Sequence, residues 1–132
     1  MKNNKGFTLI ELLAVIVILA IIALITVPTI LNIVNDARKG AAENSAAGIY
    51  EAAENYYMTT LLKQDGNFTA VVFTCNGNTC GNLDFSGTIP ETGTIKIDTA
   101  GTIDVSSGLK INGYNCTYST TAANATGTWE CK

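Results

Sequence analysis

The sequence predicts an α+β fold, in which one long N-terminal helix packs over its C-terminal half on a small antiparallel β-sheet, in the arrangement of a ladle. Two observations support this prediction. Residues 7–31 are almost all apolar, whereas the chain after Gly66 is rich in Thr, Asn, Gly and Ser and breaks into short β-branched runs. The chain has 132 residues, which leaves room for a single globular domain after the apolar segment.

The apolar segment has the length of a membrane-spanning helix. Residues 7–25 include only two polar side chains, Thr8 and Glu11. A helix needs roughly 20 residues to cross the hydrocarbon core, and this one reaches that length if it continues to about Leu31. A secretory signal peptide has a shorter apolar region of about 7–15 residues, followed by a cleavage site of small residues. We therefore expect a single-pass membrane anchor.

The helical pattern continues beyond the apolar segment to about Lys63. The positions expected on its packed face recur at helical spacing and are Ala37, Ala41, Ile49, Ala52, Ala53, Tyr56 and Leu61. Residues 64–67, Gln-Asp-Gly-Asn, form a helix breaker and predict the end of the helix.

Short runs after the helix predict strands. These runs are residues 69–75, 94–99, 102–105, 109–116 and 127–132. Because they are short and separated by turn residues, they favour an antiparallel meander, one face of which covers the C-terminal half of the helix.

The four cysteines predict disulfides in an oxidising compartment, since an even number in an exported chain is typical of such bridges. Cys75 and Cys80 are separated by four residues, and Cys116 and Cys131 by fourteen, so neither spacing is the tight pair of a zinc site. Cys75 and Cys80 flank a turn-like Asn-Gly-Asn-Thr run, which favours a local bridge. Four cysteines allow three connectivities, so the pairing stays open at this point.

Glu11 is an acidic residue within the apolar segment. At the centre of a membrane helix a carboxylate costs about 2.5–3.5 kcal/mol, and it costs less near the interface. The chain has no basic residue between Phe7 and Asp36 that could compensate this charge. Two interpretations follow: Glu11 reaches toward water at the membrane surface, or it pairs with a positive group from another copy of the chain.

The residues around Glu11 also form a specific motif. A short leader with Lys2 and Lys5 is followed by Gly6, Phe7 and then Glu11, all in register with the apolar run. This pattern resembles the class III processing site of type IV prepilins and related pseudopilins. The resemblance extends over roughly the first 40 positions of the chain.

The resemblance implies a processed, three-part chain. A prepilin peptidase cleaves between Gly6 and Phe7 in such proteins, and the new N-terminal Phe7 is N-methylated. Residues 1–6 are then the leader, residues 7–31 the transmembrane and filament-core helix, and residues 32–132 the globular head.

The resemblance also assigns roles in assembly to Phe7, Glu11 and Pro28. Cleavage creates a charged amine on Phe7, which can pair with Glu11 of a neighbouring subunit and so fix its register. Pro28 removes a backbone donor, so we expect a kink there. A bridge between Cys116 and Cys131 matches the position of the disulfide-bounded C-terminal loop of many pilins.

The expected function is that of a structural subunit of a type IV pilus, or fimbrium, with adhesion or twitching motility as typical roles. The alternatives are a pseudopilin of a type II secretion or competence DNA-uptake system, and a membrane-anchored surface binding module that does not polymerise. Glu11 and the motif disfavour the last alternative.

The implied partners are other copies of the chain, a prepilin peptidase that is also the methylase, a cytoplasmic assembly ATPase and an inner platform membrane protein. The precursor is expected in the cell membrane with its head outside, and the assembled polymer on the cell surface.

Other chemistry is not indicated by the sequence. It has no histidine and no recognisable catalytic constellation, cofactor motif or metal motif, so we expect a non-enzymatic protein. Its net charge is −3, and its one adjacent basic pair, Arg38 and Lys39, is too small a footprint for nucleic acid.

Overall fold

The computed structural model describes residues 3–119 and 127–132 and separates into two compact units. We call Met1–Asp36 the N-terminal unit and Ala37–Lys132 the globular unit. The middle of the expected C-terminal loop, residues 120–126, lies outside the described residues.

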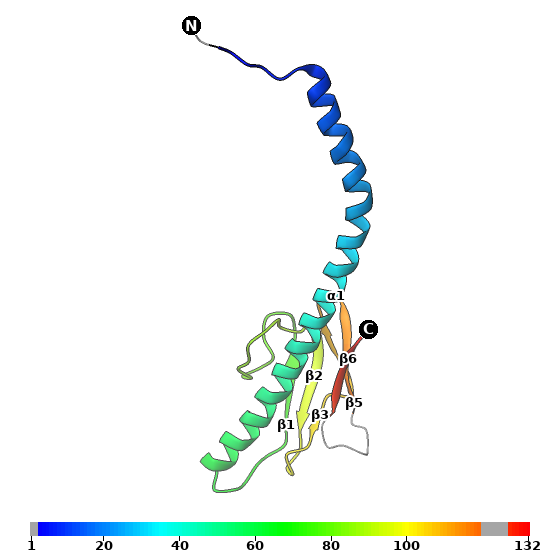
Figure 1. The fold of residues 1–132 in the computed structure, drawn as a ribbon. Coiled ribbons are helices and arrows are strands. Elements are labelled where there is room, and N and C mark those ends of the chain that lie inside the picture. Colours follow the sequence, from blue (N-terminus) through cyan, green and yellow to red (C-terminus); the bar gives the residue numbers. More distant parts are fainter. Residues whose placement is uncertain (1–2, 120–126) are drawn as a thin grey trace. The chain divides into compact units, whose positions relative to one another are not determined.

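One helix, α1, extends from Leu9 to Lys63, and its predicted end is confirmed (Figure 1). The chain enters the left-handed region at Asp65, with φ 51°, and at Gly66, with φ 85°. The Gly66 N–H then donates to the Leu61 carbonyl at 3.0 Å, which is the six-to-one bond of a Schellman-type helix end. Backbone geometry at the breaker therefore ends the helix.

The described part of the chain also forms a six-stranded sheet in which every strand pair is antiparallel. The strands are β1 (Val71–Cys75), β2 (Thr92–Ile97), β3 (Ile103–Asp104), β4 (Leu109–Ile111), β5 (Tyr114–Ser119) and β6 (Thr128–Cys131). Their order is β1-β2-β4-β5-β6, and the short β3 also pairs with β2. The predicted α+β arrangement of a long helix and a small antiparallel sheet is confirmed.

The prediction of one strand over residues 109–116 is wrong, because this run folds into a hairpin. Asn112 and Gly113, with φ values of 53° and 83°, form the turn between β4 and β5. A two-residue Asn-Gly loop suits hairpins because both of its residues accept positive φ. Glu91 braces this turn: one carboxylate oxygen accepts the Gly113 N–H at 3.2 Å, and the other lies 3.4 Å from Lys110 Nζ.

The predicted packed face of the helix is confirmed from Ile49 onward and wrong before it. Ile49 and Ala53 are buried, and Ala52, Tyr56 and Leu61 pack against the core. Ala37 and Ala41 are exposed. The buried positions follow steps of three and four residues and are Ala42, Ser45, Ala46, Ile49 and Ala53. Three of these five are alanines, whose small side chains leave the space between helix and sheet to the apolar side chains of the strands.

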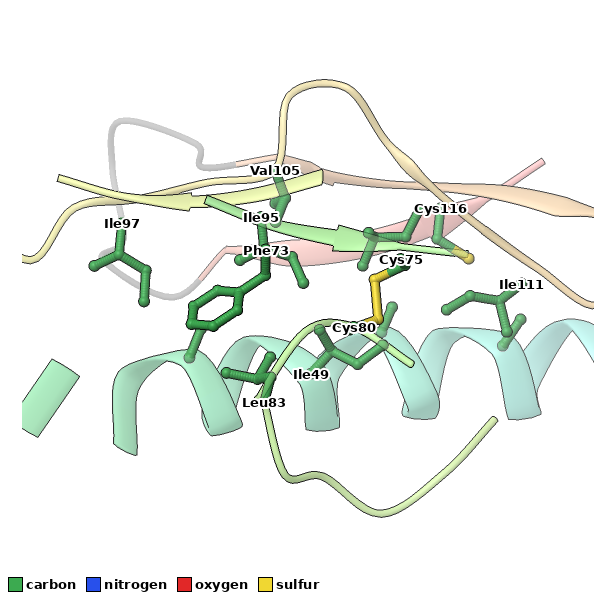
Figure 2. Packing of buried hydrophobic residues seen from close by; sticks show 14 of the residues in the cluster. Ile49, Phe73, Cys75, Cys80, Leu83, Ile95, Ile97, Val105, Ile111 and Cys116 are labelled. Atoms are coloured by element: carbon green, nitrogen blue, oxygen red, sulfur yellow. A yellow bond between two sulfur atoms is a disulfide. The ribbon is translucent and has the colours of Figure 1, made fainter. Parts of the chain in front are cut away.

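The core of the globular unit lies between α1 and the sheet. Ile49 projects from the helix toward Phe73, Ile95 and Ile97 of the strands, and Leu83 approaches from the connection between β1 and β2 (Figure 2). Ile49 and Ile95 are fully buried. This layer gives the globular unit a hydrophobic core of its own.

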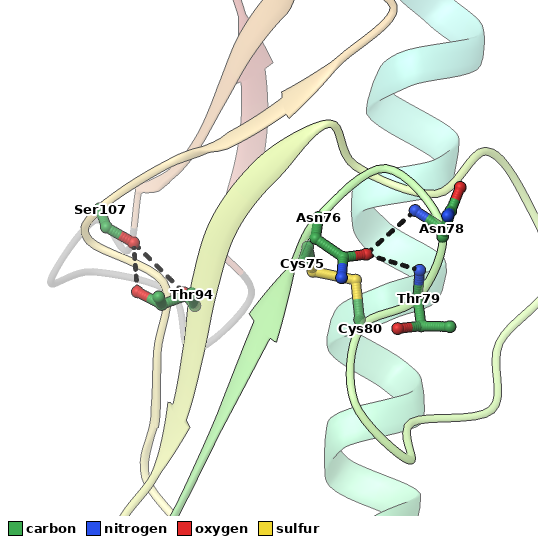
Figure 3. Close-up of a disulfide and its surroundings, with 7 residues drawn as sticks. All are labelled: Cys75, Asn76, Asn78, Thr79, Cys80, Thr94 and Ser107. Atoms are coloured by element: carbon green, nitrogen blue, oxygen red, sulfur yellow. Dashed lines mark hydrogen bonds between the residues drawn. A yellow bond between two sulfur atoms is a disulfide. The ribbon is translucent and has the colours of Figure 1, made fainter.

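Two disulfides lie within this core and join Cys75 to Cys80 and Cys116 to Cys131. The first closes a loop in which the Asn76 side-chain oxygen accepts the N–H groups of Asn78 and Thr79, each at 3.1 Å (Figure 3). The second links facing residues of β5 and β6. All four half-cystines are at most 3% exposed.

Candidate processing and assembly site

Residues 3–8, which precede α1, are all exposed. Gly6 and Phe7 precede the helix in non-helical conformation. A Cβ added to Gly6 would have no other group within 4 Å, and Phe7 is 94% exposed. The bond between Gly6 and Phe7 is thus accessible to an enzyme that binds an extended strand.

Thr8 and Glu11 hold the beginning of α1 with two reciprocal hydrogen bonds. The Thr8 N–H donates to Glu11 Oε2 at 3.0 Å, and the Glu11 N–H donates to Thr8 Oγ1 at 3.3 Å. This is a capping box, in which two backbone donors that lack helical partners are satisfied by side chains. The sequence reasoning about charge missed this role, although the Thr-x-x-Glu spacing signals it.

Glu11 therefore has a local partner but no cation. Among the residues that the structure describes, the ion pairs join Lys110 to Glu91 and Lys132 to Glu130. The carboxylate of Glu11 lies at the positive end of the helix dipole, which favours a negative charge there. Its Oε1 accepts no hydrogen bond in the described part of the chain, so one oxygen is available to a further donor.

The apolar part of α1 is exposed along its length among the residues that the structure describes. An 18-residue window of α1 reaches a mean hydropathy of 3.1 with none of it buried. The helix is long enough and apolar enough to cross a membrane. It exposes apolar side chains on every face of this part, among them Leu13, Ile16, Leu19, Ile22, Leu24 and Ile30. Since water is a poor solvent for such a surface, this segment requires lipid or other apolar helices around it.

Pro28 lies inside α1, and the helix is continuous on both sides of it. Two threonines next to it, Thr26 and Thr29, donate their hydroxyls to the carbonyls of Ile22 and Ile25 at 2.9 and 3.3 Å. These bonds satisfy both hydroxyls within the helix, as an apolar environment requires. An open hollow of about 500 Å³ lies on this part of the helix and is lined by Ala20, Ala23, Leu24, Val27 and Pro28.

Two acidic residues of the globular unit, Asp98 and Asp104, hold local turns. Asp98 Oδ1 accepts the N–H groups of Ala100 and Thr102 at 2.9 and 2.8 Å, and these bonds hold the pKa of Asp98 below its usual value. Asp104 accepts the Ser106 N–H at 2.8 Å, which lowers the pKa of Asp104 in the same way. The described residues contain no cluster of three His, Cys, Asp or Glu side chains that could hold a metal ion.

An aromatic cluster closes the core near β5 and β6. The rings of Tyr50 and Tyr118 stack with centroids 4.5 Å apart, and Trp129 lies 5.2 Å from Tyr118. Burial and the neighbouring Tyr118 raise the pKa of Tyr50 to about 12. We assign this cluster to packing of the globular unit.

Comparison with known proteins identifies the class of the N-terminal segment. Residues 1–27 match the family model of the prokaryotic N-terminal methylation motif. No curated protein and no solved structure matches the chain. The match covers the leader and most of the apolar segment, and it does not extend to the globular unit.

The motif, the apolar helix and the two disulfides together support a type IV pilin-type prepilin. The motif therefore supports a processed subunit of the pilin or pseudopilin type, a class that is usually non-enzymatic. The motif implies processing by a prepilin peptidase and filament assembly, and with the apolar helix it indicates a membrane-anchored precursor.

Proposed function

We propose that the mature chain begins at Phe7 and is the structural subunit of a type IV pilus on the cell surface. The observation that carries this proposal is Glu11, a carboxylate on an exposed apolar helix that has a helix-capping partner and no cation among the described residues. A plain membrane anchor does not need such a group.

Processing supplies the missing charge. Cleavage after Gly6 releases residues 1–6 and leaves an amine on Phe7, and N-methylation keeps this amine positively charged. In a bundle of parallel helices, the amine of one copy approaches the free Glu11 oxygen of the next. Outside water, an unpaired charge is costly and a paired one is tolerated, so the pair selects one axial register between neighbours.

The apolar segment, residues 7–31, then exchanges lipid for the equivalent segments of other copies. This exchange brings little hydrophobic gain, because lipid tails are as apolar as the side chains they contact. Extraction from the membrane therefore needs external work, which we assign to a cytoplasmic assembly ATPase acting through a platform membrane protein. The disulfide-bonded globular unit fits an oxidising exterior.

Substitution of Glu11 tests the proposal, and two variants separate charge from capping. Glu11→Gln keeps an oxygen that can cap Thr8 but removes the charge, whereas Glu11→Val removes both. If the amine is buried near this position, loss of its carboxylate costs about 3–5 kcal/mol at each subunit. We therefore expect both variants to reach normal membrane levels and to yield few sheared filaments.

Two outcomes contradict the proposal. Normal filament yield from Glu11→Gln would limit Glu11 to helix capping, and filaments whose subunits still begin at Met1 would exclude processing. Intact-mass measurement of the filament subunit is expected to give a chain that starts at Phe7 and carries one methyl group. Long filaments labelled by antibodies to this chain in electron microscopy distinguish a pilus from the short fibre of a pseudopilin.

A further inference from the structure

A polar hollow of about 310 Å³ lies on the globular unit, between α1 and the connection from β1 to β2. Its lining includes Gly48, Glu51, Asn55, Asp84 and Ser86. A second hollow of about 200 Å³ shares Asn55 and Asp84 with it and continues it along the helix. The two therefore form one groove, which we call the acidic groove.

Close packing of the connection on α1 shapes this groove. A Cβ added to Gly48 would lie 3.2 Å from the Ser86 carbonyl oxygen, so a glycine allows the connection to approach the helix. One turn of helix away, the Ser45 hydroxyl accepts the Thr88 N–H at 3.1 Å. The wall that carries Asp84 is thus held close to the helix by the close approach at Gly48 and by the hydrogen bond to the Ser45 side chain.

The charge in the acidic groove is uncompensated. Glu51 and Asp84 are both exposed, and neither makes a hydrogen bond or an ion pair within residues 3–119 and 127–132. Two carboxylates on one groove favour a ligand with positive charge and several N–H donors.

The same unit carries an equally unpaired basic pair, Arg38 and Lys39. Neither residue forms an ion pair with any acidic group in the described part of the chain. Glu51 follows Arg38 by thirteen residues on one continuous helix. At 1.5 Å and 100° per residue, the two positions are separated by about 20 Å along the axis and about 140° around it. The basic pair cannot reach the groove of its own chain.

The separation between the basic pair and the acidic groove suits a contact between two copies of the chain. Complementary patches on different faces of one chain produce a heterologous contact, which repeats from copy to copy and builds an open helical polymer when its rotation does not close a ring. We propose that the acidic groove receives Arg38 and Lys39 of a neighbouring copy, displaced by about 20 Å along the helix axis. This inference rests on the proposed function and adds a second contact, within the globular units, to the one proposed for Glu11.

Charge reversal tests the contact in the full chain. The double variant Arg38→Glu with Lys39→Glu would place two new carboxylates beside Glu51 and Asp84 of the neighbouring copy. The double variant Glu51→Lys with Asp84→Lys would place two new amines beside Arg38 and Lys39 of the neighbouring copy. We expect each double variant to yield at least about tenfold fewer sheared filaments, since juxtaposed like charges cost several kcal/mol. The combination of all four changes restores the attraction and should recover filament yield. Lys132→Glu is the matched control, because the ion-pair partner of Lys132 is Glu130, two residues away in its own chain, and it should leave yield unchanged.

Cysteine cross-linking provides a measurement that needs no charge reversal. Lys39→Cys combined with Asp84→Cys should give disulfide-linked multimers in oxidised filaments, and neither single variant should do so. Normal yield from both charge-reversed variants, or filaments in which the cysteine pair gives no multimers, would overturn the inference and leave the proposed function intact. Failure of the unaltered chain to form any filament would overturn both.

Discussion

Glu11 has enough acceptor capacity for both of the partners considered above. Its Oε2 accepts the Thr8 N–H, and its Oε1 has no partner among the described residues. An ionised carboxylate can accept about four hydrogen bonds, so the cap and an ion pair do not compete. The cap also holds the side chain in one position before any neighbour arrives, which reduces the entropy lost on pairing. Thr8 is therefore a positioning residue for Glu11.

Replacement of Thr8 by Val tests this positioning role. The change removes Oγ1, the acceptor of the Glu11 N–H, and keeps the size of the side chain. Loss of a helix cap costs typically about 1 kcal/mol, so the first-turn amides of the detergent-solubilised mature chain should exchange about fivefold faster. Thr8→Ser retains the hydroxyl and should exchange like the unaltered chain. Equal exchange in Thr8→Val would show that the cap does not stabilise this end of α1.

At the scale of the elements, local signals were more informative than periodicity. The end of α1 at Lys63 could be predicted because Asp65 and Gly66 favour left-handed backbone conformations. The N-terminal part of the buried face of α1 could not be predicted in this way, because alanines occur on all sides of the helix between residues 37 and 53 and differ little in hydropathy. Contact with the sheet decides that Ala42 is buried and Ala41 exposed.

The turn between β4 and β5 and the capping box show a different reason why prediction from the sequence failed. Asn112-Gly113 and Thr8-x-x-Glu11 are both recognisable patterns in the sequence, but stronger patterns around them directed the prediction. The turn residues 106–108 set residues 109–116 apart as one strand, and the charge of Glu11 within the apolar segment suggested a distant partner. The acidic groove, in contrast, depends on the packing of Ser86 against Gly48, which no local pattern indicates.

The two disulfides should differ in their contribution to stability. In the chain-entropy model, a bridge between residues 15 apart, such as Cys116 and Cys131, contributes about 3 kcal/mol, and one between residues 5 apart about 2 kcal/mol. Replacement of Cys116 and Cys131 together by Ala should therefore lower the free energy of unfolding more than replacement of Cys75 and Cys80. Urea unfolding of the solubilised subunit, followed by near-ultraviolet circular dichroism, measures the difference.

Peptide mapping without reduction has to accompany that measurement. It should recover fragments that link Cys75 with Cys80 and Cys116 with Cys131. A fragment that joins Cys75 to Cys116 would contradict this pairing, and equal losses of stability in the two double variants would contradict the loop-length argument.

At the scale of the whole molecule, the two units need different surroundings. The described residues of the N-terminal unit, 3–36, expose apolar side chains on every face of their part of α1 and contribute none to the buried core. The globular unit has a core of buried apolar residues, both disulfides and all of the sheet. Folding of the residues before Ala37 should therefore require membrane or polymer contacts, whereas folding of residues 37–132 should not.

A fragment of residues 37–132 tests this division. Exported to an oxidising compartment, it should be a soluble monomer with both disulfides and the near-ultraviolet spectrum of the full subunit, because its folding is driven by burial within its own layers. Ile49→Asp in this fragment places an unpaired charge at a fully buried position and should prevent folding. Met58→Asp, at a position that is 60% exposed, is the matched control and should fold normally. A fragment that aggregates or lacks tertiary structure would contradict this division. It would show that folding of the globular unit depends on the apolar half of α1, so that the chain folds as a single unit.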